Sequence, residues 1–272
     1  MKTYSYIFPL LTVLIFPLTG CNGNSGKSKI SRPDLPKEVR PVAEAIVNES
    51  PEEFASAVSY PIERPYPLKN VEDSASMVAY YPNLIDEPLK KAVTETPDSA
   101  WQQEGWRGWT LDNGSYFWID EGKIYSMTYV SKKETQMLDS LQHLEISSLE
   151  PSLQPNWIPV ACVVDSVSGA IFRIDTKADS EPAVYRLAGY SDGSDLSGAP
   201  TVVLYGSLEL EGSMGNRFYH FSDENGTTAL YTPDISDDEA VPEIEIDKKG
   251  KSKRYGARPA YWLDHVKKDK RK

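Results

Sequence analysis

The chain has 272 residues, 40% of them hydrophobic and 25% charged, which is the composition of a globular protein with one large domain or two of ordinary size. Its formal net charge of -11 at pH 7 argues against nucleic acid as a partner, because most of the surface would repel a phosphate backbone. There are two cysteines, Cys21 and Cys162. If Cys21 serves another purpose, a disulfide framework is excluded and packed cores must supply the stability.

Residues 1–20 have the order of a secretory signal, because Lys2 precedes an apolar run from Tyr6 to Leu18. The run is too short and too interrupted by proline to be a comfortable membrane span, which needs ~20 apolar residues. The sequence Leu-Thr-Gly-Cys that ends at Cys21 resembles the bacterial lipobox. This resemblance implies that residues 1–20 are removed and that the Cys21 thiol carries diacylglycerol. The alternative is a free cysteine beside an ordinary cleavage site.

The predicted lipid on Cys21 determines the expected location of the protein. Several acyl chains on one N-terminus hold a protein to a bilayer more firmly than a single chain does. We therefore expect a lipid-anchored protein of the bacterial cell envelope, at the outer membrane, with the membrane as one partner. Residues 21–35 consist largely of small, polar residues and proline, and we predict that they form a flexible tether.

Helical patterns dominate residues 36–149, which we predict to be the first folded domain. Apolar residues at helical spacing, capping residues and prolines at first helical positions mark the helices. The expected helices are residues 36–48, a short helix that begins at Pro51, one that follows Asp73, one that begins at Pro88 and one within residues 132–149. Residues 60–68 contain Pro61, Pro65 and Pro67, which permit at most an edge strand.

A three-stranded antiparallel meander is predicted between Trp106 and Tyr129. Two acidic, glycine-terminated turns, residues 112–114 and 120–122, allow the chain to reverse tightly because Asn, Asp and Gly tolerate positive φ. The runs between the turns are aromatic and β-branched, which is typical of a sheet with one covered face.

The order of helices, edge strand, helices and meander resembles the NTF2-like α+β fold, in which a curved antiparallel sheet wraps around helices. A cystatin-like sheet with a helix is the alternative. Three short sequences carry a further resemblance, Tyr60-Pro61-Ile62, Val78-Ala79-Tyr80-Tyr81 and Trp106-Arg107-Gly108-Trp109. They are similar to a module of Bacteroides-type lipoproteins of unassigned function.

Residues 150–156, with a proline near each end, are the predicted linker to a second domain. Residues 157–233 contain six short strand-like runs separated by turn clusters rich in Gly, Asp and Ser, which indicates a small all-β barrel or sandwich. Residues 234–272 form an acidic block followed by a basic block. Such opposed charge blocks are usually solvated, and we expect a charged, partly disordered tail.

Patterns for catalysis are weak in this sequence. Residues 189–193 match the nucleophile-elbow pattern, but the residues that follow cannot start a convincing helix, so that a loop turn is the better interpretation. The carboxylates of Asp112, Asp120 and Glu121 could serve a hydrolase, although acids in turns are ordinarily structural. We predict no catalytic residue, no metal site and no cofactor. Cys162, within an apolar run, is expected to be a small buried hydrophobe.

The aromatic residues of the meander suggest a binding site. Alternate residues of a strand point to opposite faces, so that Trp106, Trp109 and Trp118 cannot all enter the core. At least one of them beside Arg107 could therefore bind a sugar, a peptide or another protein, while core packing is the competing explanation. The resulting function is a noncatalytic, lipid-anchored binding protein for a protein, peptide or glycan. The alternatives are a carboxylate-dependent hydrolase of envelope material and a structural component of an outer-membrane assembly.

Overall fold

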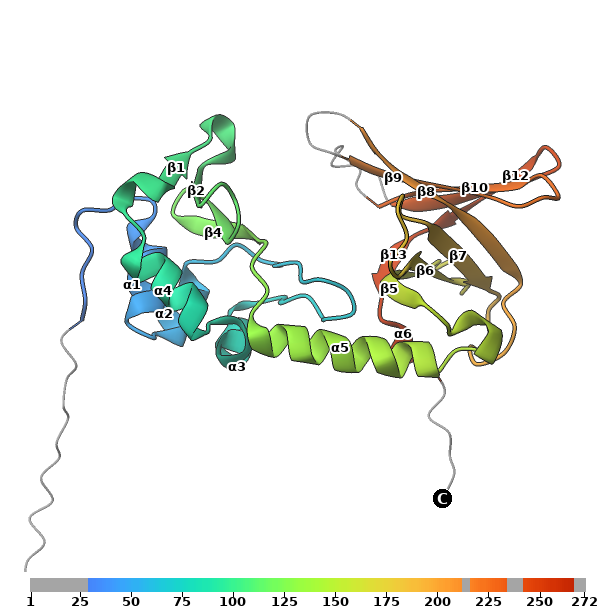
Figure 1. Ribbon diagram of the computed structural model, residues 1–272, viewed down its shortest axis with the longest axis horizontal. Helices are drawn as coiled ribbons and strands as arrows, with labels where there is room; N and C mark the ends of the chain where they lie inside the picture. Colours follow the sequence, from blue (N-terminus) through green and yellow to red (C-terminus); the bar gives the residue numbers. More distant parts are fainter. Residues whose placement is uncertain (1–28, 212–215, 234–241, 267–272) are drawn as a thin grey trace, which may run out of the picture.

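A computed structural model describes residues 29–211, 216–233 and 242–266 of the chain. The predicted signal peptide and Cys21 lie outside the described residues. The described part is α+β, with six α-helices, a four-stranded sheet and a nearly closed nine-stranded antiparallel sheet. Figure 1 shows two lobes above one long helix. We call residues 29–131 the first lobe and residues 157–266 the second lobe.

The first lobe packs short helices against the small sheet. Its elements are α1 (Arg40–Val47), α2 (Pro51–Ser56), α3 (Ser74–Leu84), α4 (Glu87–Glu95), β1 (Trp101–Gln103), β2 (Trp109–Leu111), β3 (Phe117–Asp120) and β4 (Lys123–Met127). Asp73 and Asp86 accept hydrogen bonds from backbone N–H groups in the first turns of α3 and α4. Buried apolar side chains from all four helices and from the sheet form one core. The four helices begin close to the positions that the sequence predicts.

The small sheet differs from the predicted meander in two ways. It has four strands in the order β1-β2-β3-β4, so that β1 is added before the three predicted strands. Trp106 and Arg107 lie in a 3-10 turn, Gly105–Arg107, that joins β1 to β2, and not in a strand. The positive φ angles of Gly105 (57°) and Gly108 (79°) cause this reversal. Residues 60–68 form no strand and contribute only an isolated bridge between Ile62 and Val71.

Helix α5 (Lys132–Ser147) runs from the first lobe to the second (Figure 1). It begins with a capping box in which the Ser131 side chain and the Glu134 side chain satisfy each other's backbone N–H groups. A 3-10 turn, Pro151–Leu153, follows within the predicted linker. No helix among the described residues is long and apolar enough to cross a membrane.

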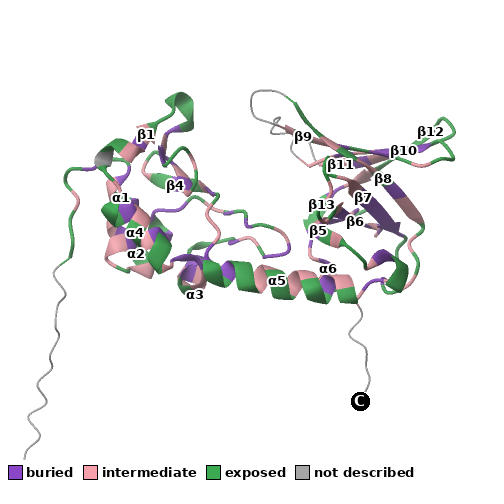
Figure 2. Cartoon of the chain, in the orientation of Figure 1, coloured by how far each residue is buried: buried purple, intermediate pink, exposed green. Residues whose placement is uncertain are grey.

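The second lobe is a rolled antiparallel sheet. Its strands are β5 (Trp157–Val164), β6 (Ile171–Lys177), β7 (Tyr185–Tyr190), β8 (Val202–Glu211), β9 (Asn216–Ser222), β10 (Thr227–Thr232), β11 (Glu243–Lys248), β12 (Lys251–Gly256) and β13 (Arg258–Ala260), followed by α6 (Trp262–His265). The first six strands coincide closely with the predicted runs. One apolar core fills the interior of the sheet, and a second lies between its outer face, α6 and the end of α5. The strands between these cores are accordingly buried in Figure 2.

The segment predicted to be a charged tail contributes three strands and a helix to this lobe. On β11, Ile244 is fully buried and Ile246 is partly buried, at alternate positions among acidic residues. Arg254 on β12 pairs with Glu243 and Glu245 on β11 at 3.6 and 3.1 Å. The alternating isoleucines and the cross-strand charges stabilise a strand pair, which explains why residues 243–260 are ordered in the sheet.

The chain itself closes the rolled sheet. β12 and β13 are the two edge strands, yet only Ala257 separates them in sequence. The backbone N–H of Ala257 donates to the carbonyl oxygen of Pro242 at 2.7 Å, and the N–H of Gly256 donates to Asp165 at 3.2 Å. Because one residue cannot span an open nine-stranded sheet, the two edges must lie close together.

Candidate functional site

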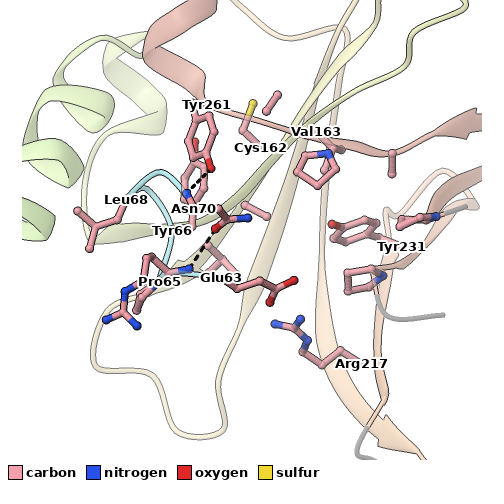
Figure 3. A pocket seen from close by; sticks show the side chains of 18 of the residues that line it. Glu63, Pro65, Tyr66, Leu68, Asn70, Cys162, Val163, Arg217, Tyr231 and Tyr261 are labelled. Carbon is pink, nitrogen blue, oxygen red and sulfur yellow. Dashed lines mark hydrogen bonds between the residues drawn. The ribbon is translucent and has the colours of Figure 1, made fainter. Parts of the chain in front are cut away.

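A cleft of about 660 Å³ lies between the two lobes (Figure 3). Residues 63–70 and β4 form its first-lobe side, and β5, β9, β10 and residues 257–261 form its second-lobe side. Its volume falls in the range of small-ligand sites, roughly 300–1,000 Å³. The lining includes five tyrosines and four prolines, namely Tyr66, Tyr125, Tyr219, Tyr231, Tyr261, Pro65, Pro233, Pro242 and Pro259. The cleft therefore has the size and the aromatic lining of a ligand site.

Arg64 fixes the wall that the first lobe contributes. Its guanidinium forms a bidentate ion pair with Glu134 at the start of α5, and both N–O distances are 2.8 Å. It also donates to the carbonyl oxygens of Met127 at 3.0 Å and Tyr129 at 2.7 Å. The Tyr80 hydroxyl donates to the same carboxylate at 2.8 Å, and both charged side chains are fully buried. These converging bonds hold the segment around Arg64 against the small sheet.

Two stacked tyrosines join the lobes beside the cleft. The rings of Tyr66 and Tyr261 are 6.2 Å apart and nearly parallel, with an interplanar angle of 5°. The Tyr66 hydroxyl donates to Glu145 at 2.9 Å and accepts from the backbone N–H of Trp262 at 3.2 Å. The Tyr261 hydroxyl accepts from the backbone N–H of Asn70 at 2.9 Å. Burial raises the pKa of Tyr66, so that its hydroxyl stays protonated and remains a donor.

A buried charge cluster supports this junction from the second lobe. Arg173 on β6 donates to Glu145 at 2.8 Å and to Asp175 at 2.7 Å, and Arg186 on β7 donates to Asp175 at 2.7 Å. Each of these four charged side chains is at most 1% exposed. Burial raises the pKa of Glu145, and the nearby Arg173 opposes that shift. Two cations thus balance two carboxylates, and the cluster holds α5 against the outer face of the large sheet.

The cleft presents opposite charges on its two sides. Glu63 extends from the first lobe and Arg217 from β9, and Figure 3 shows both charged groups directed into the space between the lobes. Arg217 also takes part in an interaction within the protein, and the five N–H donors of a guanidinium allow more than one partner. Among the described residues that line the cleft, Glu63 is the one carboxylate. This arrangement can bind donors and acceptors of one ligand at two separate points.

Cys162 lies in the cleft wall and is 2% exposed. Burial raises the pKa of its thiol, whereas a nucleophilic cysteine requires a lowered pKa. The structure thus agrees with the sequence interpretation of Cys162 as a small buried hydrophobe. Within the described ranges, no group of three or more His, Cys, Asp or Glu side chains is arranged to hold a metal ion.

The four residues predicted to bind a ligand occupy two different settings. Trp106 is 73% exposed at the turn between β1 and β2, and the Arg107 guanidinium lies 5.6 Å from the centre of its ring. The 3-10 turn brings the two side chains together. The Tyr125 hydroxyl donates to the carbonyl oxygen of Arg107 at 3.0 Å, so that Tyr125 connects this turn to the cleft. Trp109 and Trp118 are half-buried on β2 and β3.

The residues considered for catalysis lie away from the cleft. Asp112 and Glu121 are exposed in the turns that flank β3, and Asp120 is the exposed last residue of β3. None of the three lines the cleft. Residues 189–193 end β7 and enter a turn, and no helix follows them. The structure therefore places neither these acids nor Ser191, the serine of residues 189–193, in the lining of the cleft.

Sequence reasoning did not select the residues that line the cleft. Glu63 and Arg217 come from distant segments of the chain. Local sequence patterns do not predict the relative placement of two lobes. One weak signal was present, because a proline occurs within two residues of Tyr66, Tyr231 and Tyr261. No family model, no curated protein and no solved structure was found to match the chain.

Proposed function

We propose that the chain is a noncatalytic binding protein that holds an extended ligand in the cleft between its lobes. The observation that carries this proposal is the cleft of about 660 Å³ with tyrosine rings from both lobes in its lining. Aromatic rings offer large, rigid contact area to a ligand. Hydrolysis of a glycan commonly uses two carboxylates that flank the bond, and Glu63 alone is available among the described lining residues. Binding is therefore the better-supported function.

A peptide segment fits the lining better than a neutral glycan. Three of the lining tyrosines, Tyr66, Tyr125 and Tyr261, use their hydroxyls in hydrogen bonds within the protein. They offer ring faces to a ligand rather than free hydroxyls, and ring faces suit apolar side chains and proline. Glu63 and Arg217 match the ammonium, amide and carboxylate groups of a peptide, whereas a neutral sugar carries no charge to pair with them.

The Trp106 and Arg107 turn is proposed as an extension of the same site. Tyr125 contacts the turn and lines the cleft, so that a ligand longer than the cleft would reach Trp106 next. The first lobe is proposed to be a variant of the NTF2-like or cystatin-like fold, since helices precede and cover an antiparallel sheet. We further propose that the protein belongs with Bacteroides-type lipoproteins and sits in the cell envelope.

The envelope location rests on the sequence around Cys21, and it has its own test. Changing Cys21 to Ser in the full chain, expressed in a bacterium with the lipoprotein pathway, should abolish labelling by a radioactive fatty acid and move the protein from the membrane fraction to the soluble fraction. Lipid labelling that persists in the variant would refute the anchor. This outcome is independent of ligand binding in the cleft.

Ligand binding can be tested by equilibrium dialysis of the full chain against two probe mixtures. One mixture is a tryptic digest of a denatured, unrelated protein, and the other consists of neutral maltodextrins. Mass spectrometry of both chambers shows which components the protein retains. We expect a subset of peptides to be retained, and Tyr125→Ala to weaken their binding about tenfold, equivalent to ~1.4 kcal/mol.

Tyr205→Ala is the matched control, because Tyr205 is 49% exposed and Tyr125 is 41% exposed, but Tyr205 does not line the cleft. This control should bind the retained peptides as the parent chain does. Retention of maltodextrins instead of peptides would support a binding function but would refute the proposal that the ligand is a peptide. If neither mixture is retained, the cleft is not a site for these ligands, and a structural role in an outer-membrane assembly gains support.

A further inference from the structure

A second pocket, of about 340 Å³, lies where the first lobe, α5 and α6 meet, and we call it the junction pocket. Residues 67–71 and α3 line it from the first lobe, and residues 261–264 line it from the second. Figure 1 shows α3 at the beginning of α5 and α6 toward its end. Leu68, Asn70 and Tyr261 also line the cleft, so that the two spaces share one wall. The aliphatic side chains of the lining are Pro67, Leu68, Val71, Met137, Leu141 and Leu263.

Three of these apolar residues lie outside the cores of the protein. Leu68 is 2% exposed, and Met137 and Leu141 are partly buried on α5. None of the three belongs to the apolar cores formed by the described residues of the two lobes. The stretch of α5 between the lobes therefore turns apolar surface toward the junction pocket and not toward a core.

The charged groups of the lining are already paired within the protein. Lys69 forms an ion pair with Asp264 at 2.7 Å, and both side chains are exposed, so that the pocket reaches the surface beside them. Glu145, the other charged residue of the described lining, is buried and accepts a hydrogen bond from Arg173 at 2.8 Å. A charged ligand would lose its hydration without gaining an unpaired partner of opposite charge. The lining thus favours an uncharged ligand.

The walls of the junction pocket are fixed by hydrogen bonds between its parts. The Tyr80 hydroxyl on α3 donates to Glu134 on α5 at 2.8 Å. The Tyr261 hydroxyl accepts from the backbone N–H of Asn70 at 2.9 Å, which joins residues 67–71 to the second lobe. The pocket is therefore preformed, and little of the binding free energy would be spent on ordering its walls.

We propose that the junction pocket binds an uncharged, apolar small molecule about the size of two fused rings. A cavity of roughly 150 Å³ lined by apolar side chains can hold benzene, and the junction pocket has about twice that volume. Such a ligand is recognised by shape and by the removal of apolar surface from water. It would contact both lobes and α5 at once, and would stabilise their junction. The proposal does not depend on the ligand of the cleft.

Titration of the full chain with the uncharged naphthalene dye prodan tests the proposal, because the emission of prodan moves to shorter wavelength in apolar surroundings. We expect saturable binding. Leu141→Trp, which fills the pocket, should weaken this binding at least about tenfold, since each methylene-sized contact that the ligand loses costs about fourfold. Met137→Trp fills the pocket from the preceding turn of α5 and should have the same effect.

Leu144→Trp is the matched control, because Leu144 lies on the same helix, is 53% exposed and does not line the pocket. It should bind prodan as the parent chain does, and urea denaturation should show that all three tryptophan variants are folded. The apolar N-terminal residues are the same in every variant, so that they do not affect the comparison. Equal losses in the control and in the two pocket variants would overturn the proposal, as would the absence of saturable binding to the parent chain.

Competition by three compounds that share the naphthalene ring tests the charge of the ligand. Methylnaphthalene is uncharged, naphthoate is an anion and naphthylmethylammonium is a cation. Methylnaphthalene should displace prodan, and both ions should bind at least about tenfold more weakly. An ion that competes as well as methylnaphthalene would refute the uncharged ligand. Weaker prodan binding in Tyr125→Ala, with no change in Leu141→Trp, would place the dye in the cleft and overturn the junction pocket as its site.

Discussion

Replacing Arg64 by methionine removes the charge that holds one wall of the cleft while it keeps much of the side-chain volume. Glu134 would remain as a fully buried carboxylate with donors only from Tyr80 and the backbone of Ser131. Breaking a buried ion pair by removing one partner costs about 3–5 kcal/mol. We therefore expect Arg64→Met to lower the free energy of unfolding by that amount.

The assay is urea denaturation followed by tryptophan fluorescence, with circular dichroism as the second probe of the same transition. The double variant Arg64→Met with Glu134→Leu removes the stranded charge and should recover at least about 2 kcal/mol of the loss. If the single variant lost less than about 1 kcal/mol of unfolding free energy, the ion pair could not be buried, because solvent-exposed ion pairs contribute about that much to stability. A double variant as unstable as the single one would contradict the reasoning that the uncompensated carboxylate causes the loss.

Three further predictions concern the second lobe, each measured by urea denaturation or thiol labelling. Hydrogen bonds from Ser168 lower the pKa of Asp165, so that its contribution to stability is present above the unfolded pKa of 3.8 and is lost as the pH falls through the lower folded value. Asp165→Ala should accordingly cost about 1–2 kcal/mol at neutral pH and little at the lowest pH at which the protein folds. Gly206→Ala should prevent normal pairing of β8 with β9, because the added Cβ would lie 1.7 Å from the carbonyl oxygen of His220. Cys162 should react with a thiol reagent only after unfolding, and rapid labelling of the native chain would show that its burial is wrong.

Local signals explain which elements could be predicted from the sequence. The strands β5 to β10 are separated by turn clusters rich in Gly, Asp and Ser, and these residues determine chain reversal within a few positions. Helix α5 begins directly after Ser131, the N-cap residue that forms a capping box with Glu134. Both kinds of signal act over short stretches of chain and do not depend on the rest of the fold.

Charge concealed the strand pattern of the last part of the chain. Ile244 and Ile246 alternate with acids, which is a strand pattern of period two, but the number of charges in the segment favoured the prediction of a tail. The strand becomes stable when β10 pairs with one edge of β11 and β12 with the other. The Trp106 turn was missed because the predicted meander began at Trp106, whereas Trp106 and Arg107 lie in a 3-10 turn that precedes β2.

The cleft could not be predicted because its width depends on contacts between segments far apart in sequence. Trp262 on α6 is fully buried, and its indole N–H donates to Ser148, just after α5, at 2.8 Å. Lys69 in the first lobe pairs with Asp264 on α6 at 2.7 Å. Together with the hydrogen bond from Tyr66 to Glu145, these contacts hold both lobes to α5. A ligand would meet a preformed cleft, so that little of its binding free energy would be spent on ordering the protein.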